Sequence, residues 1–309
     1  MESFYLEVPF ERYQVRSQLA PRTDSRGSED FKERPWVVLS GPAVHQRGLF
    51  IASSITHAED RRSDGYLLEV DVRPSDVLKQ PPHLLDLQQL WTFPEERDDS
   101  GNLVGTLCPE TKCRTVAERL RGRLFGERVI TPDAACPLDS SPPRVGQVVW
   151  IDLVGDTEDE QSDLFTVCRA FEQAGILWLD GPTSRMPALV ILSSATASSF
   201  DPYVLRLLTV VPLIYCPSLL QEYDMEAPKI RLKDAFRDGE PIYLAPLTQL
   251  LLTLDYHPKP LSPKNKQGRR YAQPRRVFLN NGPQQSWCVE PDELDGVLRE
   301  VAEFLGLET

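Results

Sequence analysis

The residues best suited to chemistry are acids and hydroxyls that follow short apolar runs in the second half of the sequence. Asp156 follows the run Val148–Val154 and Asp180 follows Ile176–Leu179, while serines and threonines follow Leu189–Leu192. If these runs are parallel strands, the polar residues meet at the carboxyl edge of the sheet, where open α/β sheets bind ligands. They could hold a ribose or Mg²⁺ there, although solvated turns and helix caps have the same composition. The predicted ligand-binding residues are Asp156, Asp180, Ser193, Ser194 and Thr196.

A basic segment, residues 259–276, is the second candidate site. It carries seven bases and no acid, in a chain whose formal net charge is −12. Such a segment could grip a nucleic-acid phosphate backbone while Tyr271 stacks on a base. An acidic protein partner, or no ligand at all, would suit the same composition. The predicted contact residues are Lys264, Lys266, Arg269, Arg270, Tyr271, Arg275 and Arg276.

Metal, cofactor and catalytic motifs give weaker signals. Cys108 and Cys113 have the spacing of half a zinc site and Cys136 could add a third thiolate, but a fourth ligand is not evident. His57 lies near two acids and could act in acid–base chemistry, although a loop histidine beside acids is ordinary. Neither a glycine-rich phosphate loop nor a hydrolase motif occurs. We therefore expect no metal, no cofactor and no catalytic residue, and the balance is against an enzyme.

The elements that would position these residues fall into two halves. The first half is expected to be a β-rich, mixed α+β domain over residues 1–143, with a short helix at His83–Trp91 and another opened by the capping box Thr115–Glu118. The proline-rich stretch Pro132–Pro143 marks the boundary. The expected strands are Phe4–Val8, Trp36–Leu39, Leu49–Ile55 and Tyr66–Val72.

The second half, residues 144–309, is expected to be a three-layer α/β domain with a mainly parallel sheet. An amphipathic helix ends at Gly175 and leads directly into a strand, as crossover helices of parallel sheets do. Pro291–Leu305 is a second amphipathic helix, with proline in its first turn. No internal repeat is evident.

One pattern resembles a known family. The helix and strand at Phe171–Asp180, with the apolar runs on either side, are similar to the first βαβ unit of Toll/interleukin-receptor (TIR) domains over residues 147–217. The resemblance implies a flavodoxin-like fold. The family's second helix is missing at Asp180–Pro187, and Asp201 is the one acid where NAD-cleaving members carry a glutamate. The resemblance therefore implies an interaction role rather than NAD cleavage.

Composition narrows the class of function. The 309 residues are 41% hydrophobic and 26% charged, as in soluble globular proteins. No signal peptide or membrane span is evident, so we expect a cytoplasmic protein that does not bind membranes. We predict a non-catalytic interaction or adaptor subunit of an intracellular complex, defence-related assemblies included, with protein partners. The alternatives are a nucleotide- or NAD-processing enzyme at the strand ends and a nucleic-acid-binding component that uses residues 259–276.

Overall fold

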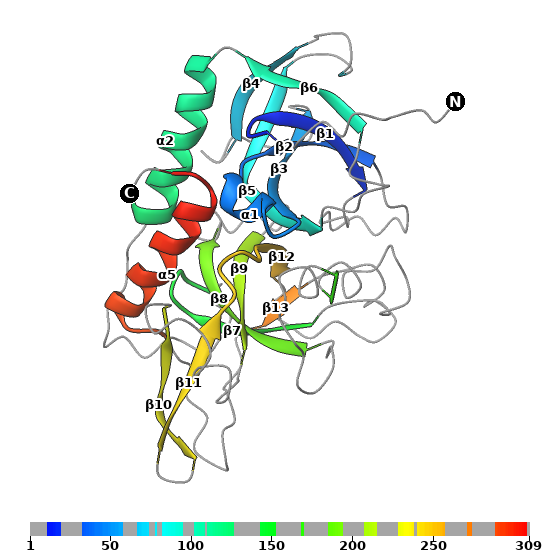
Figure 1. The fold of residues 1–309 in the computed structure, drawn as a ribbon. Helices are drawn as coiled ribbons and strands as arrows, with labels where there is room; N and C mark the ends of the chain where they lie inside the picture. The colour runs from blue at the N-terminus through cyan, green and yellow to red at the C-terminus, as the bar shows by residue number, and fades with distance from the viewer. Residues whose placement is uncertain are drawn as a thin grey trace.

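The chain folds into two strand-rich halves, one above the other in Figure 1. The structure is a computed structural model. It describes residues 11–19, 33–57, 67–73, 78, 82–94, 102–108, 110–126, 143–152, 168–169, 185–193, 207–214, 228–237, 240–256, 271–273 and 288–307.

Six strands of the first half form a closed barrel, which we call the first barrel. Its strands follow one another in the order β1-β2-β3-β5-β4-β6, and every pairing is antiparallel. Helix α1 (Pro42–His45) lies between β2 and β3, and helix α2 (Glu110–Gly126) follows β6. The strands are β1 (Gln14–Leu19), β2 (Glu33–Val38), β3 (Leu49–His57), β4 (Leu67–Arg73), β5 (His83–Pro94) and β6 (Asn102–Cys108).

Strand β5 corrects the prediction of a helix at His83–Trp91. Nearly every side chain of β5 is buried, so its sequence lacks the alternation of polar and apolar residues that identifies a half-buried strand. Its aromatic residues pack with those of β2 and β3: the ring of Phe93 lies 5.0 Å from that of Trp36, edge to face, and 5.2 Å from that of Phe50, stacked. Aromatic side chains of this kind favour a pleated sheet over a helix.

The second half forms a sheet that also closes on itself. Its order is β10-β11-β9-β12-β13-β7-β8, and a further β8–β9 pairing joins β7, β8, β9, β12 and β13 in a ring, which we call the second barrel. The β10–β11 hairpin extends from the ring, away from the first barrel (Figure 1). The strands are β7 (Val148–Asp152), β8 (Arg185–Ser193), β9 (Leu207–Ile214), β10 (Ile230–Arg237), β11 (Glu240–Pro246), β12 (Leu252–Tyr256) and β13 (Tyr271–Gln273).

The parallel α/β fold predicted for the second half is wrong. The apolar runs at β7, β8 and β9 are neighbouring strands, but both β7–β8 and β8–β9 pair antiparallel. Only β12 and β13 pair in parallel among the described strands. Successive strand ends therefore point in opposite directions, so the predicted ligand edge and the flavodoxin-like architecture are both absent from this sheet.

The second barrel repeats the strand pairings of the first. β7, β8 and β9 pair in sequence as β1, β2 and β3 do, and β10 pairs with β11 as β4 pairs with β5. β11 and β12 pair with β9 as the single strand β5 pairs with β3, and β13 pairs with β7 as β6 pairs with β1. One pairing differs: β6 meets β4, whereas β13 meets β12. The prediction that the chain has no internal repeat is therefore wrong.

The turns that lead into the two barrels agree in detail. Tyr13 and Gly146 both have positive φ, 70° and 86°. The Tyr13 N–H donates to the Val38 carbonyl over 2.7 Å, and the Gly146 N–H donates to the Val190 carbonyl over 2.8 Å. Val38 and Val190 occupy the same place in β2 and β8, because each lies two residues after the first residue paired to the next strand. The repeat therefore extends to single backbone hydrogen bonds.

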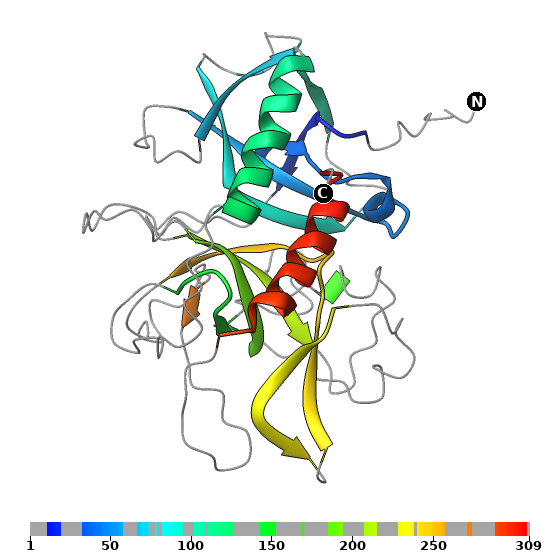
Figure 2. The same ribbon diagram turned by 90° about the vertical axis from the view of Figure 1, so that its left-hand side faces the viewer.

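Two helices predicted from the sequence are confirmed. The first is α2, which buries Val116, Leu120 and Leu124; it begins at Glu110, so Thr115 lies inside the helix and the predicted capping box at its start is wrong. The second is α5 (Pro291–Phe304), which follows the last strand as α2 follows β6 and carries a capping box at Glu290. The two helices contact each other along one side of the molecule (Figure 2). Within the described residues, no helix has the length and apolar character needed to cross a membrane.

Candidate functional site

The first barrel buries a charged residue on β1. Arg16 is 4% exposed, and its Nε and Nη2 both donate to Oε1 of Gln14, over 3.2 and 3.1 Å. Residues two apart on a strand point to the same face, which is why these two side chains meet. A buried guanidinium is costly to desolvate, so its presence calls for an explanation.

A second buried polar group lies on the neighbouring strands β3 and β5. Ser54 Oγ donates to Gln89 Oε1 over 3.1 Å, and Gln89 Nε2 donates to Asp86 Oδ2 over 2.7 Å. The other carboxylate oxygen of Asp86 accepts the backbone N–H of Gln88 over 3.2 Å. Arg16 and Ser54 are in register with the same β2 residue, Trp36, so the two groups share one row of the sheet. We call Gln14, Arg16, Ser54, His83, Asp86 and Gln89 the polar set of the first barrel; all six are buried.

The second barrel has apolar residues at five of the six matching positions. Strand register and equal spacing along the chain define the matches. Gln14 is matched by Gln147, which is also buried. Since the same fold forms without the other five, the polar set is not a requirement of the fold. The pairs are Arg16 and Val149, Ser54 and Pro212, His83 and Leu244, Asp86 and Leu247, and Gln89 and Leu250.

Four residues of types that could take part in catalysis have neighbouring backbones at one corner of the first barrel. His57 at the end of β3 pairs with His83 at the start of β5, and Thr56 pairs with Leu84. Arg34 lies two residues before Trp36, the first β2 residue paired with β3, and Trp36 faces Ser54. The backbones of His57, His83, Thr56 and Arg34 thus lie at one corner of the barrel; positions 57 and 83 share one face of the sheet, and position 56 lies on the other, because successive strand residues alternate between faces. Among the described residues, Leu244, Met186 and Ile214 of the second barrel match His83, Arg34 and Thr56.

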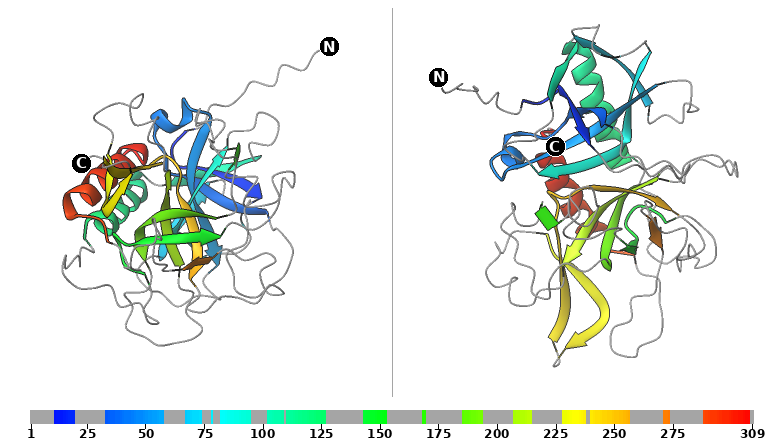
Figure 3. Two further views of the ribbon diagram at one scale, coloured as in Figure 1. Left: turned by 90° about the horizontal axis from the view of Figure 1, so that it is seen from below. Right: turned by 90° about the vertical axis from the view of Figure 1, so that its right-hand side faces the viewer.

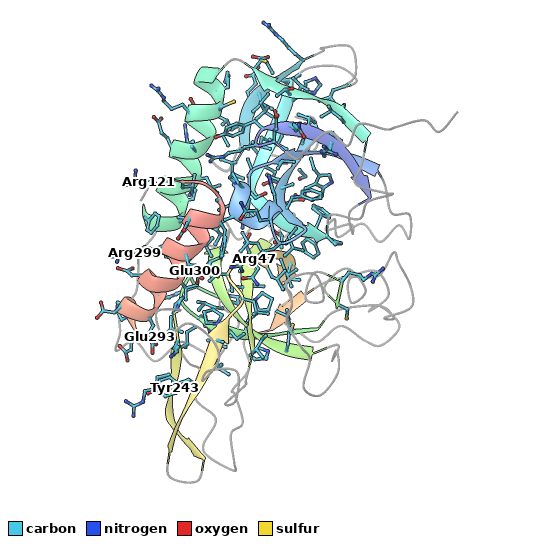
Figure 4. The ribbon with its side chains drawn as sticks, in the orientation of Figure 1. Arg47, Arg121, Tyr243, Glu293, Arg299 and Glu300 are labelled. Carbon is cyan, nitrogen blue, oxygen red and sulfur yellow. The ribbon has the colours of Figure 1, made fainter. Side chains whose placement is uncertain are left out.

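A half-buried carboxylate lies where the two barrels meet. Burial raises the pKa of Glu300 on α5; a hydrogen bond with Thr248 and the charge of Arg47 act in the opposite direction. Arg47 belongs to the first barrel, and its guanidinium lies 5.2 Å above the ring of Phe304 (Figure 4). In the first barrel, burial likewise raises the pKa of Tyr13. Glu300, Arg47 and Phe304 contribute to the junction rather than to the corner that holds the histidines, whereas the Tyr13 hydroxyl donates to the Cys113 carbonyl of α2 over 3.2 Å.

The ligand-binding residues predicted from the sequence are not assembled by the described structure. Ser193, the last residue of β8, is buried and donates to the Pro143 carbonyl over 2.9 Å. That bond is a structural role for its hydroxyl. Asp156, Asp180, Ser194 and Thr196 lie outside the described residues.

Most of the basic segment also lies outside the described residues. Tyr271 is the exception, because β13 places its backbone between Asp152 of β7 and Asp255 of β12. Lys264, Lys266, Arg269, Arg270, Arg275 and Arg276 are not described.

The cysteines proposed as half a zinc site are Cys108 and Cys113. Both are free thiols of intermediate exposure, and Cys113 Sγ lies 4.0 Å from the Leu107 carbonyl oxygen. Cys136 is not among the described residues. No group of three or more potential metal ligands occurs in the part of the chain that the structure covers.

A comparison with known protein families finds a match for the first barrel. Residues 16–123 match the model of the PemK-like, MazF-like toxins of type II toxin–antitoxin systems. The match begins in β1 and ends in α2, so it covers nearly all of one barrel with its closing helix. A search of curated proteins found no match to the chain.

The family match corrects several predictions. The TIR-like resemblance is wrong, because β7, β8 and β9 pair antiparallel and the family that matches the chain is that of the PemK-like, MazF-like toxins, which have a β-barrel-like fold. The prediction of a non-catalytic adaptor subunit is wrong for the same reason, since PemK-like toxins are typically RNA-cleaving enzymes. The expectation of a soluble protein with protein partners is compatible with this family.

Sequence reasoning missed the candidate corner of the first barrel. It recognised His57 but assigned His83 to a helix, so the two histidines were never placed together. The one signal that could have found the corner was the composition of residues 83–94, with its aromatic side chains.

Proposed function

We propose that the first barrel is an endoribonuclease of the toxin type and that its active site is the corner formed by β2, β3 and β5. The family match over residues 16–123 supports this assignment, because members of that family typically cleave RNA. The corner supplies the residue types that such a reaction uses.

One observation carries the proposal: the second barrel lacks these residues. It builds the same strands with Met186, Ile214 and Leu244 where the first barrel has Arg34, Thr56 and His83. His83 is 7% exposed, and a buried polar group costs free energy unless it is paired, so the fold alone gives no reason to keep this histidine. Retention in one barrel of two indicates a chemical use.

The chemistry follows from the residue types. In RNA cleavage without a metal, a base removes the proton of the ribose 2′-OH, and the oxygen attacks the adjacent phosphorus. An acid then protonates the departing 5′-oxygen, which leaves a 2′,3′-cyclic phosphate. His57 and His83 supply the base and the acid, because histidine titrates near neutral pH. Arg34 is the cation proposed to bind the phosphate and stabilise its charge in the transition state; it would reach the phosphate round the end of the strands, because its position lies on the other face of the sheet from the two histidines.

Partners follow from the same assignment. A type II toxin is paired with a protein antitoxin, so we propose a protein partner in addition to RNA, and a cytoplasmic location where both occur. The basic segment 259–276 is proposed as a further contact for the RNA backbone. The division into domains 1–143 and 144–309 remains a proposal; it falls between α2 and β7.

RNA cleavage by the purified chain tests the proposal. A 5′-labelled single-stranded RNA is incubated in buffer with EDTA, and products are resolved on a gel. The variants Arg34→Met, Thr56→Ile and His83→Leu introduce the residues of the second barrel. Loss of an acid, a base or a phosphate contact should lower the rate by roughly 10²–10⁴-fold.

Arg73→Met is the matched control. Arg73 is exposed at the far end of β4, where it pairs with Thr106 of β6. This variant should cleave at the rate of the unmodified chain. Absence of cleavage by the unmodified chain, or equal rates for Arg34→Met and Arg73→Met, would refute the assignment.

A further inference from the structure

The two barrels meet through matching threonines, Thr92 on β5 and Thr253 on β12. Thr92 pairs with Ile51 of β3, and Thr253 pairs with Thr209 of β9, which is the residue that matches Ile51. Both threonines are 1% exposed. They therefore occupy one position of the repeated fold, and each lies at the boundary with the other barrel.

The hydrogen bonds of these threonines are reciprocal. The Thr92 N–H donates to the Leu251 carbonyl over 2.9 Å, and Thr92 Oγ1 donates to the Gln249 carbonyl over 2.9 Å. In the other direction, Thr253 Oγ1 donates to the Leu90 carbonyl over 2.9 Å and lies 3.2 Å from the Gln88 carbonyl. Each threonine thus binds carbonyls two and four residues before the other.

In an interface with two-fold symmetry, residue i of one copy contacts residue j of the other, and residue j of the first copy contacts residue i of the second. The closing helices obey the same relation, because α2 of one barrel contacts α5 of the other. Figure 3 shows the two barrels from two further directions, with their strands crossing at the boundary. Two unrelated domains would have no reason to pair the same positions in both directions.

The symmetry of these hydrogen bonds is not exact. Thr209 Oγ1 donates to the Gln88 carbonyl over 2.7 Å, whereas the matching residue of the first barrel is Ile51, which has no donor on its side chain. Leu251 N also donates to Thr92 Oγ1 over 2.8 Å. The junction is therefore a two-fold interface whose two halves have diverged in sequence.

We infer that the chain is a fused dimer: residues 144–309 are a diverged second copy of the first barrel, bound to it through a self-complementary face. The partner that this face fits is a barrel of the same fold, supplied by the same chain. This inference stands on the junction and the repeat alone, so it does not depend on the proposed ribonuclease activity.

A cleavable version of the full chain tests the inference. A protease recognition sequence is inserted between Ala134 and Ala135, and the purified protein is cut. Light scattering under native conditions should give the mass of the uncut chain, near 35.0 kDa, because the junction holds the two halves together. Separation of the two fragments would overturn the inference.

Matched substitutions in the cut protein test the symmetry. Thr92→Val and Thr253→Val each remove buried hydrogen bonds while keeping the side-chain shape, and each should weaken association of the fragments roughly 10-fold. Thr106→Val, on an exposed position of β6, is the control and should leave association unchanged. The two-fold assignment fails if only one of the two junction variants weakens association, or if neither differs from the control.

Discussion

The side-chain amide of Gln89 donates to Oδ2 of Asp86 over 2.7 Å, with both residues buried on strand β5. Their counterparts in the second barrel are Leu250 and Leu247, which need no such bond. The fold is therefore compatible with either a polar or an apolar pair at these two positions. Each barrel therefore shows which residues the shared fold accepts at the matching positions of the other barrel.

Replacement of Asp86 alone should destabilise the protein. Asp86→Leu leaves the Gln89 amide and the Gln88 N–H without their buried acceptor, which costs about 1–3 kcal/mol for each unsatisfied group. The triple variant Asp86→Leu, Gln89→Leu and Ser54→Ala should recover part of that loss, because it removes the orphaned Gln89 amide together with the Ser54 hydroxyl that donates to Gln89. Urea unfolding measures both; a triple variant less stable than the single one would contradict the expectation.

The positive φ of Gly146 predicts a backbone effect. Gly146→Ala places a side chain in the left-handed region at φ 86° and should lower the free energy of unfolding by about 1–2 kcal/mol. A Cβ added at Gly122 in α2 would meet no atom within 4 Å, so Gly122→Ala should instead raise the free energy of unfolding, by about 0.5–1 kcal/mol. Thermal unfolding of the two variants distinguishes the signs.

The raised pKa of Glu300 predicts that the stability of the protein depends on pH. Burial raises its pKa in the folded state, so between the ordinary value of 4.5 and the raised value the folded state binds more protons than the unfolded state. Its contribution to stability is complete below pH 4.5 and is lost as the pH rises through the raised pKa. Glu300→Gln should remove this loss, so the variant should gain stability relative to the unmodified chain as the pH rises above 4.5.

The control for this experiment is Glu118→Gln, which changes an exposed glutamate on helix α2. It should leave the pH profile of unfolding close to that of the unmodified chain. Equal profiles for Glu300→Gln and the unmodified chain would show that burial of Glu300 does not affect stability.

The reciprocal hydrogen bonds of the junction predict equal losses in the free energy of unfolding when Thr92 or Thr253 is replaced. Thr92→Val and Thr253→Val in the uncut chain should each lower the free energy of unfolding by about 1–3 kcal/mol, because each removes buried hydrogen bonds to backbone carbonyls. Urea denaturation measures both variants beside Thr106→Val. A loss at Thr253 without one at Thr92 would be inconsistent with the reciprocal bonds.

Local structure was the part of the fold that the sequence predicted best. Strands at Trp36–Leu39 and Leu49–Ile55 and the helix at Pro291–Leu305 follow from β-formers and from an apolar stripe. Strand direction did not follow, because a buried apolar run reads the same in parallel and antiparallel sheets. The predicted fold class, ligand edge and family resemblance all depended on parallel strands, so all three were wrong.

The repeat escaped detection because matched positions differ in character. Polar residues of the first barrel, such as Asp86, stand where the second has leucine, and β5 corresponds to two strands, β11 and β12. One signal survived: Gln88, Leu90 and Thr92 recur with the same spacing as Gln249, Leu251 and Thr253. Those residues make the junction, so their spacing is constrained on both sides.

The most direct test of the functional claim is the rate at which the Arg34→Met chain cleaves a single-stranded RNA that the unmodified chain cleaves. Met186 shows that the fold accepts methionine at this position. We predict a fall of roughly 10²-fold or more with no change in thermal stability. An unchanged rate would place the active site elsewhere and contradict the proposed role of the corner.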